Sequence, residues 1–238
     1  MEKEIVYIAE LDADVDDVVA AEYLHKHGVL KEVVRDPEPR TYAGKKRQAD
    51  LCALGIKVSK RMPPTVEYVF VGGALTEVAR YLTMHKIGCL VMNGGFVGCN
   101  IVKNPLEKFS GKKTVRTFNF NCDVYAADKV LKSPNIGKII LIGKNVCHSP
   151  KNTLNGIWSC EKDLLEKYHV KSDKRLHDLL ACREGLVQLG VLNEEPLLKF
   201  DYVRPYNTGL KGNMTEWGST YGVYGETLYN PVLAAIGK

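Results

Sequence analysis

Residues 5–17 read IVYIAELDADVDD. The first seven are mostly apolar and β-branched, which is typical of a short strand buried inside a sheet. The last six include four aspartates, and the apolar side chains at residues 18–24 then have the spacing of a helix with one buried face. This segment therefore predicts a strand, an acidic loop and a helix, which is the opening unit of an α/β fold.

The same order of elements recurs along the chain. Further strands are predicted at residues 29–34, 68–71, 89–92 and 138–142, and further helices at residues 45–54, 75–84, 124–131 and 173–189. This alternation predicts one α/β domain over residues 1–238, with a mainly parallel, doubly wound (Rossmann-like) sheet and helices on both faces. The tail at residues 200–224 is rich in Tyr, Gly and Thr and predicts a C-terminal β-hairpin.

Composition argues against several classes of protein. The chain has 238 residues and a net charge of +5, and its basic residues are scattered rather than gathered in the dense stripe that a nucleic-acid-binding surface needs. No apolar run approaches the length of a membrane span, so no membrane partner is expected. The seven cysteines contain no Cys-x-x-Cys pair, and no apolar leader precedes the first strand. A reducing, cytoplasmic location is therefore expected.

The acidic loop is expected at the functional edge of the sheet. In doubly wound sheets, ligands bind beyond the carboxyl ends of the strands. The acidic loop, Gly72-Gly73, Asn93-Gly94-Gly95 and Gly143 all follow predicted strands, so they are expected to converge at one rim. Five carboxylates lie within residues 10–17, and their mutual repulsion is unfavourable unless a cation or solvent screens it.

Three simple readings of the acidic loop are available. It can be a solvated turn in which Asp14 or Asp16 caps the following helix. Asp12, Asp14 and Asp16 match the first ligands of an EF-hand, but Asp17 and Tyr23 stand where that motif needs Gly and Glu. Asp12 and Asp14 also match the D-x-D of haloacid dehalogenase-type phosphatases, although the downstream acidic motif that would hold magnesium is not evident.

A fourth interpretation accounts for more of the chain. Five segments follow one another in order: ELDADVDD at residues 10–17, VGGALTE at 71–77, VMNGG at 91–95, TFNFNCD at 117–123 and LHDLLA at 176–181. In that order they resemble the D-x-D-P-G-x-D-D, G-P-L-T-N, M-G-G, E-F-N-x-x-D-P and H-D-P-L-A motifs of the inosine-uridine preferring nucleoside hydrolases. The resemblance implies a short, divergent member of that family.

The resemblance further implies a Ca²⁺-dependent hydrolase that cuts the N-glycosidic bond of ribonucleosides and releases free base and ribose. Carried over residue by residue, the metal ligands are Asp12, Asp17, the backbone carbonyl of Thr76, and Asp178. Hard oxygen ligands of this kind suit calcium. Asp12 would also take a proton from the metal-bound water as general base.

The other carried-over residues would hold the substrate or protonate the leaving base. Asp16, Asn93 and Asn119 are assigned to substrate binding, and His177 to proton donation, because imidazole titrates in the required range. His177 can instead be a structural histidine at a helix start, and Thr76 a plain helix cap. The other histidines are expected on the surface.

The sequence also departs from the family pattern. Ala13 and Asp14 replace the Pro-Gly of the first motif, and Thr117 replaces the Glu that contacts the ribose 5′-hydroxyl in relatives. Residues 35–39 stand where the family has a segment around a Gly-Asn pair. The residues that match the family's metal ligands are therefore kept better than those that match its substrate-binding residues. A modified nucleoside or larger ribosyl conjugate as substrate, or a non-catalytic ligand-binding homologue, are therefore alternatives. Family members commonly form homodimers or homotetramers.

Overall fold

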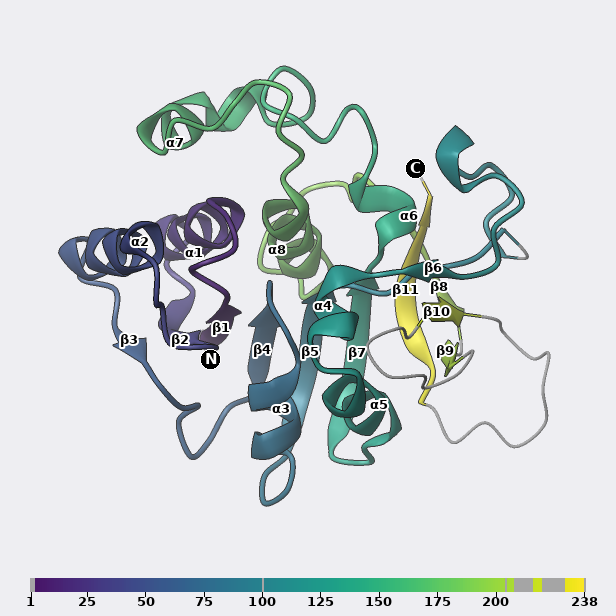
Figure 1. The fold of residues 1–238 in the computed structure, drawn as a ribbon, viewed down its shortest axis with the longest axis horizontal. Helices are drawn as coiled ribbons and strands as arrows, with labels where there is room; N and C mark the ends of the chain where they lie inside the picture. The colour runs from purple at the N-terminus through teal and green to yellow at the C-terminus, as the bar shows by residue number, and fades with distance from the viewer. Residues whose placement is uncertain (1–2, 100, 204, 208–215, 220–229, 238) are drawn as a thin grey trace.

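The computed structural model describes residues 3–99, 101–203, 205–207, 216–219 and 230–237 (Figure 1). Its main sheet contains β1 (Ile5–Ala9), β2 (Leu30–Arg35), β3 (Val58–Ser59), β4 (Tyr68–Val71), β5 (Ile87–Asn93), β7 (Ile136–Ile142), β8 (Lys199–Val203) and β11 (Val232–Gly237). The eight strands have the order β3-β2-β1-β4-β5-β7-β11-β8. Neighbouring strands are parallel except β11 and β8, which are antiparallel.

Helices cover both faces of this sheet. They are α1 (Asp16–Lys26), α2 (Tyr42–Ala53), α3 (Thr76–Tyr81), α4 (Phe118–Cys122), α5 (Val124–Lys132), α6 (Lys144–Cys147), α7 (Lys162–Lys167) and α8 (His177–Gln188), with short 3₁₀ turns at Glu107–Phe109 and Ser159–Glu161. Alternate residues of β1 face opposite layers: Ile5 and Tyr7 belong to the core under α1 and α8, and Val6 and Ile8 to the core under α3 and α5. The sheet is therefore buried on both sides, as its continuous apolar strands predict.

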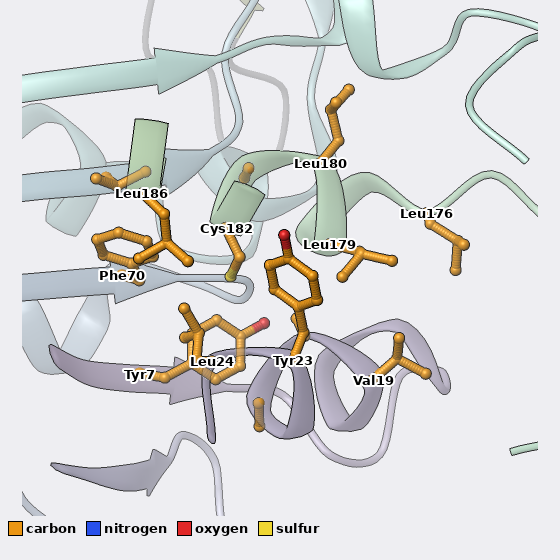
Figure 2. Close-up of a cluster of buried hydrophobic side chains, with 14 of the residues drawn as sticks. Tyr7, Val19, Tyr23, Leu24, Phe70, Leu176, Leu179, Leu180, Cys182 and Leu186 are labelled. Carbon is orange, nitrogen blue, oxygen red and sulfur yellow. The ribbon is translucent and has the colours of Figure 1, made fainter. Parts of the chain in front are cut away.

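Close packing fixes the position of α8 against α1 and the sheet. Side chains of α1 and α8, including Tyr23, Leu24, Cys182 and Leu186, fill the space between the two helices and the sheet (Figure 2). A Cβ atom on Gly185 would lie 2.8 Å from the Phe70 ring, so only glycine lets α8 approach β4 this closely. The start of α8 is thereby held over the carboxyl ends of the strands.

The predicted fold class is confirmed, with differences at the ends of elements. The first predicted strand ends at Ala9 rather than residue 11, and the second predicted helix begins at Tyr42 rather than residue 45. The earlier helix start arises because the Thr41 side chain accepts a hydrogen bond from the backbone N–H of Gly44. The helix predicted from residue 173 begins at His177.

The C-terminal segment contains the expected antiparallel pairing. Strand β9 (Pro205–Asn207) pairs with β10 (Glu216–Ser219), which also pairs with β6 (Val115–Arg116). The rest of the predicted hairpin, at residues 204, 208–215 and 220–224, lies outside the described residues. Within the described ranges, no helix has both the length and the apolar character needed to cross a membrane.

Candidate functional site

A cavity of about 470 Å³ lies at the carboxyl ends of β1, β4, β5 and β7. Its walls come from the loop after β1 and the start of α1, from Gly72 after β4, and from residues 93–95 after β5. The first residues of α4 and α8 and both ends of α6 complete them. These segments are far apart in sequence, and the parallel topology brings them together because every contributing strand ends at the same edge.

Two carboxylates meet in this cavity on either side of a glycine. A Cβ atom on Gly72 would lie 2.5 Å from Asp17 Oδ1 and 3.0 Å from Asp178 Cγ. Asp17 Oδ1 accepts hydrogen bonds of 3.1 Å from the Tyr7 hydroxyl and from the backbone N–H of Glu10. The absence of a side chain at Gly72 therefore allows the first turns of α1 and α8 to bring their acids close together.

Asp16 performs a structural task beside this pair. Its Oδ2 accepts hydrogen bonds from the backbone N–H groups of His177, at 2.5 Å, and Asp178, at 3.0 Å. The residue before α8, Leu176, offers no side-chain cap of its own. A carboxylate at a helix N-terminus satisfies free N–H groups and favours the positive end of the helix dipole. Asp16 on α1 thus caps α8 from another helix.

The acids at this point are crowded and removed from solvent. Burial, followed by repulsion from Asp14, raises the pKa of Asp16 to about 7. Burial, followed by repulsion from Asp16, raises the pKa of Asp17 to about 8. Burial and the charges of Asp16 and Asp17 also raise the pKa of Asp178 well above its ordinary value. Ionising all three carboxyls together is unfavourable unless a cation compensates the charge.

Asn93 and Asn119, both predicted to bind substrate, form hydrogen bonds between different segments of the cavity wall. Asn93 Nδ2 donates a 2.6 Å hydrogen bond to Asp178 Oδ1. Asn119 Nδ2 donates to the backbone carbonyls of Gly72, at 2.6 Å, and Asn93, at 2.8 Å. Because the amide nitrogens face protein acceptors, the Oδ1 atom of each side chain is left to accept a hydrogen bond from a ligand.

The donors fit a hard divalent cation. Asp17 and Asp178 each use one carboxylate oxygen for hydrogen bonds, and within the described part of the chain Oδ2 of each accepts none. Both residues line the cavity, together with the carboxylate-bearing Asp14 and Asp16. Oxygen donors from separate loops, with more than one carboxylate, are the set that calcium prefers.

Two of the predicted ligand residues, Asp12 and Thr76, are not among the residues that line the cavity. The carboxylate of Asp12 accepts hydrogen bonds from the backbone N–H groups of Arg40, at 2.7 Å, and Thr41, at 3.1 Å, and from the Thr41 hydroxyl, at 2.6 Å. Thr76 is exposed at the first turn of α3, and its hydroxyl donates to Asp123 Oδ2.

The Asp12 carboxylate is therefore not among the groups that line the cavity. The role predicted for Thr76 belongs to its backbone carbonyl, which the hydroxyl contact does not involve, so that role stays a prediction. The Asp12 carboxylate is directed toward the start of α2, because the backbone N–H groups of Arg40 and Thr41 donate hydrogen bonds to it. In its place Glu10 and Asp14 line the cavity. Asp14 Oδ2 is held at 2.6 Å by the Lys174 ammonium group.

His177 lies in the cavity beside a second histidine. Its ring centroid is 4.8 Å from that of His148, and its Nε2 is buried without a hydrogen-bond partner among the described residues. Burial, followed by the charge of Lys174, lowers the pKa of His177 to about 4, so its imidazole is neutral near pH 7. His148, expected on the surface, lines the cavity instead. Its isolated position in the sequence gave no indication of this.

Comparison with known proteins adds to this geometry. No family model matches the chain. An uncharacterized protein from Aquifex aeolicus (strain VF5) is 29% identical over 143 residues, which cover 55% of this chain and 46% of that protein. The chain thus spans about half the length of the curated relative that it matches.

A solved structure matches the chain almost throughout. It is the crystal structure of an inosine-uridine preferring nucleoside hydrolase from Bacillus anthracis, with a TM-score of 0.61, covering 98% of this chain and 93% of that one. The chain has a nucleoside hydrolase-like fold. At 17% sequence identity the match concerns the fold, which is the part of the predicted resemblance that it confirms.

Proposed function

We propose that the chain is a calcium-dependent hydrolase that cuts the N-glycosidic bond of a ribonucleoside-type substrate and releases a free base. The observation that carries the proposal is the pair of buried carboxylates, Asp17 and Asp178, that meet across Gly72 inside the cavity. The nucleoside hydrolase-like fold supports it, because the pair lies at the carboxyl edge of the sheet, where doubly wound folds bind ligands.

Asp17 and Asp178 would hold the calcium ion through their unpaired Oδ2 atoms. When bound, the ion compensates the crowded carboxylates and lowers the pKa of a coordinated water. Asp16 is a positioning residue and not a calcium ligand in this proposal. Its carboxylate caps the helix that carries Asp178 and so holds Asp178 in place.

The chain's own side chains have three further roles in the proposal. The Oδ1 atoms of Asn93 and Asn119 accept hydrogen bonds from ribose hydroxyls, since the amide nitrogens are already engaged. The acidic side of the cavity stabilises the positive charge that develops on the ribosyl ring as the bond to the base breaks. His177 donates a hydrogen bond to the departing base from its neutral imidazole.

Glu10 is the residue to which we assign proton uptake from the attacking water. It lines the cavity, and its carboxylate accepts no hydrogen bond from the described residues, whereas both oxygens of Asp14 are engaged by Lys174 and the backbone N–H of Asp16. Asp12, the base that the resemblance assigns, is turned toward Thr41. A general base must reach the water whose proton it accepts.

A reducing-sugar assay over a panel of purine and pyrimidine ribonucleosides and ribosyl conjugates tests the proposal. Activity should disappear on chelation, return with excess calcium, and be lost in Asp17→Asn but kept in Asp50→Asn, a control on the surface of α2. Glu10→Gln should lower kcat more than Asp12→Asn does. Sugar release that is indifferent to chelation and to Asp17→Asn would refute the proposal. Ligand-dependent thermal stabilisation without sugar release would point to a binding protein instead.

A further inference from the structure

One part of the cavity wall carries basic side chains in place of carboxylates. Lys144 and His148, at the two ends of α6, line the cavity, and the Lys108 ammonium group lies 2.7 Å from His148 Nδ1. We refer to Lys108, Lys144 and His148 as the basic wall. In the described residues neither lysine has a carboxylate within ion-pair distance.

The protonation of His148 is fixed by its neighbour. An ammonium group can only donate hydrogen bonds, so Nδ1 of His148 must accept from Lys108 and Nε2 must carry the ring hydrogen. Burial, followed by the electrostatic interaction with the neighbouring His177 and by the charge of Lys108, lowers the pKa of His148 to about 3, so the ring stays neutral. His148 is therefore a hydrogen-bond donor on the wall of the cavity.

A further donor on this side of the cavity is unused. The Thr117 hydroxyl is buried and has no hydrogen-bond partner among the described residues, although Thr117 lines the cavity. The Lys144 ammonium group lies beside it, because Lys144 Nζ donates a 2.8 Å hydrogen bond to the carbonyl of Arg116, the preceding residue. A buried hydroxyl without a partner is unfavourable, and a bound acceptor would remove the penalty.

The same region could be read as a metal site, but its chemistry opposes this. Cys147, His148 and His177 offer ligand atoms that lie within 4.8 Å of one another. A cation there would lie close to Lys108 and Lys144, and His148 Nε2 carries a hydrogen in place of a free lone pair. Burial also raises the pKa of the Cys147 thiol, which opposes the thiolate that a soft metal needs. The donors favour an anion.

We propose that the basic wall binds an oxyanion carried by the substrate, namely a phosphate monoester on the 5′-carbon of its ribosyl group. This rests on the proposed function: with the base on C1′ and the 2′- and 3′-hydroxyls directed to the carboxylate side, the 5′-carbon is the position left for a charged group. Lys144, the His148 Nε2–H and the Thr117 hydroxyl would bind the phosphate oxygens, with Lys108 orienting His148. The substrate class is then nucleoside 5′-monophosphates or their conjugates.

Binding of ribose 5-phosphate and of ribose, measured by calorimetry in the presence of calcium, tests the basic wall directly. Charge-assisted hydrogen bonds predict that the folded chain binds the phosphate ester more tightly by about tenfold or more. Lys144→Met should remove most of this difference, while Lys129→Met, an exposed lysine of α5 outside the cavity, should not. Thermal unfolding of Lys144→Met checks that the variant is folded. Equal affinities for the two sugars, or a preference that survives Lys144→Met, would overturn the proposal.

A second measurement separates a phosphate on the substrate from free phosphate. Base release from a nucleoside 5′-monophosphate is compared with release from the nucleoside alone and from the nucleoside with inorganic phosphate. A higher kcat/KM for the monophosphate, lost in Lys144→Met, supports the proposal. Equal kcat/KM for nucleoside and monophosphate, or Lys144-dependent stimulation by inorganic phosphate alone, would overturn it. Lys144-dependent binding of ribose 5-phosphate without any base release would instead contradict the proposed hydrolase function and leave the anion site standing.

Discussion

The carboxylate of Asp16 accepts a 3.0 Å hydrogen bond from the backbone N–H of Asp178, a residue 162 positions later in the chain. The same oxygen accepts from the N–H of His177. The first turn of α8, which carries the two residues assigned to metal binding and to the leaving base, is therefore held by a side chain of α1.

Replacing Asp16 by alanine and by asparagine separates its two effects. Asparagine keeps an oxygen that accepts from the α8 N–H groups and removes the charge that crowds Asp17, whereas alanine removes both. We expect the alanine variant to have a free energy of unfolding lower than that of the asparagine variant by about 1 kcal/mol, the typical contribution of a helix cap. Urea unfolding without calcium measures this. Equal stabilities of the two variants would show that Asp16 does not act as a cap.

Gly72→Ala should damage the site while leaving the sheet in place. The added Cβ would lie 2.3 Å from the Tyr7 hydroxyl and 2.5 Å from Asp17 Oδ1, so these groups must move apart. Overpacking of this kind costs about 1–3 kcal/mol of stability. Calcium binding, followed by calorimetry, should weaken as well. Gly237→Ala is the matched control, because its Cβ meets nothing within 4 Å. If Gly72→Ala binds calcium with unchanged affinity, Asp17 and Asp178 are not the residues that bind the ion.

Calcium should stabilise the folded chain through Asp17 and Asp178. In the proposed site the ion binds only the folded chain, in which the pair is assembled, so a concentration of about 100 times Kd should raise the free energy of unfolding by about 2.7 kcal/mol. Asp17→Asn and Asp178→Asn should lose this response, and Asp50→Asn should keep it. Thermal unfolding with calcium and with chelator gives the answer. A calcium response of wild-type size in Asp178→Asn would place the ion elsewhere.

Glu77 should contribute stability that disappears in acid. Burial acts to raise the pKa of Glu77, but hydrogen bonds from Arg80 and from the backbone N–H of Met62 lower it overall. A carboxyl whose pKa is lower in the folded state stabilises that state above its unfolded pKa. This contribution is lost as the pH falls below about 4.3 and passes through the folded value.

Glu77→Gln should consequently be less stable than the wild type at pH 7, and the two should converge as the pH falls. Urea unfolding at a series of pH values from 7 downward measures the gap. Glu166→Gln provides a control, since Glu166 is an exposed partner of Lys162 and should show little difference at any pH. A gap between wild type and Glu77→Gln that is independent of pH would mean that Glu77 acts through packing rather than charge.

The sequence predicts the frame of the site better than its details. Short apolar runs identify the strands, and the parallel order then brings Gly72 and Asn93, which stand at or just beyond the ends of β4 and β5, to the same edge as the acidic loop between β1 and α1. Asp17 lies at the start of α1, directly after that loop. Asp178 joins them because the apolar side chains of α8 fix that helix against α1 and the sheet. The spacing of apolar residues along the chain therefore predicts the strands and helices that bring these residues together.

The spacing of residues in the sequence does not predict the direction in which an individual side chain points. Asp12 turns away from the cavity because the backbone N–H groups of Arg40 and Thr41, almost 30 residues later, offer it hydrogen bonds of 2.7 and 3.1 Å (sequence separations 28 and 29). His148 lies in the cavity because α6 follows β7 at the same edge as the acidic loop. Both outcomes depend on contacts between distant segments, which no spacing rule near either residue could indicate.

The bond from Asp178 to Asp16 also bears on how the protein matures. A chain emerging from the ribosome completes its first acidic helix long before the segment near residue 178 exists, so for most of translation Asp16 has no helix to cap and Asp17 no facing acid. If calcium binds as proposed, the Asp17–Asp178 pair can bind it only after the C-terminal half has folded back onto the first strands. A fragment ending before α8 would keep the acidic loop but lack Asp178, and the proposal predicts that it does not bind calcium at this site.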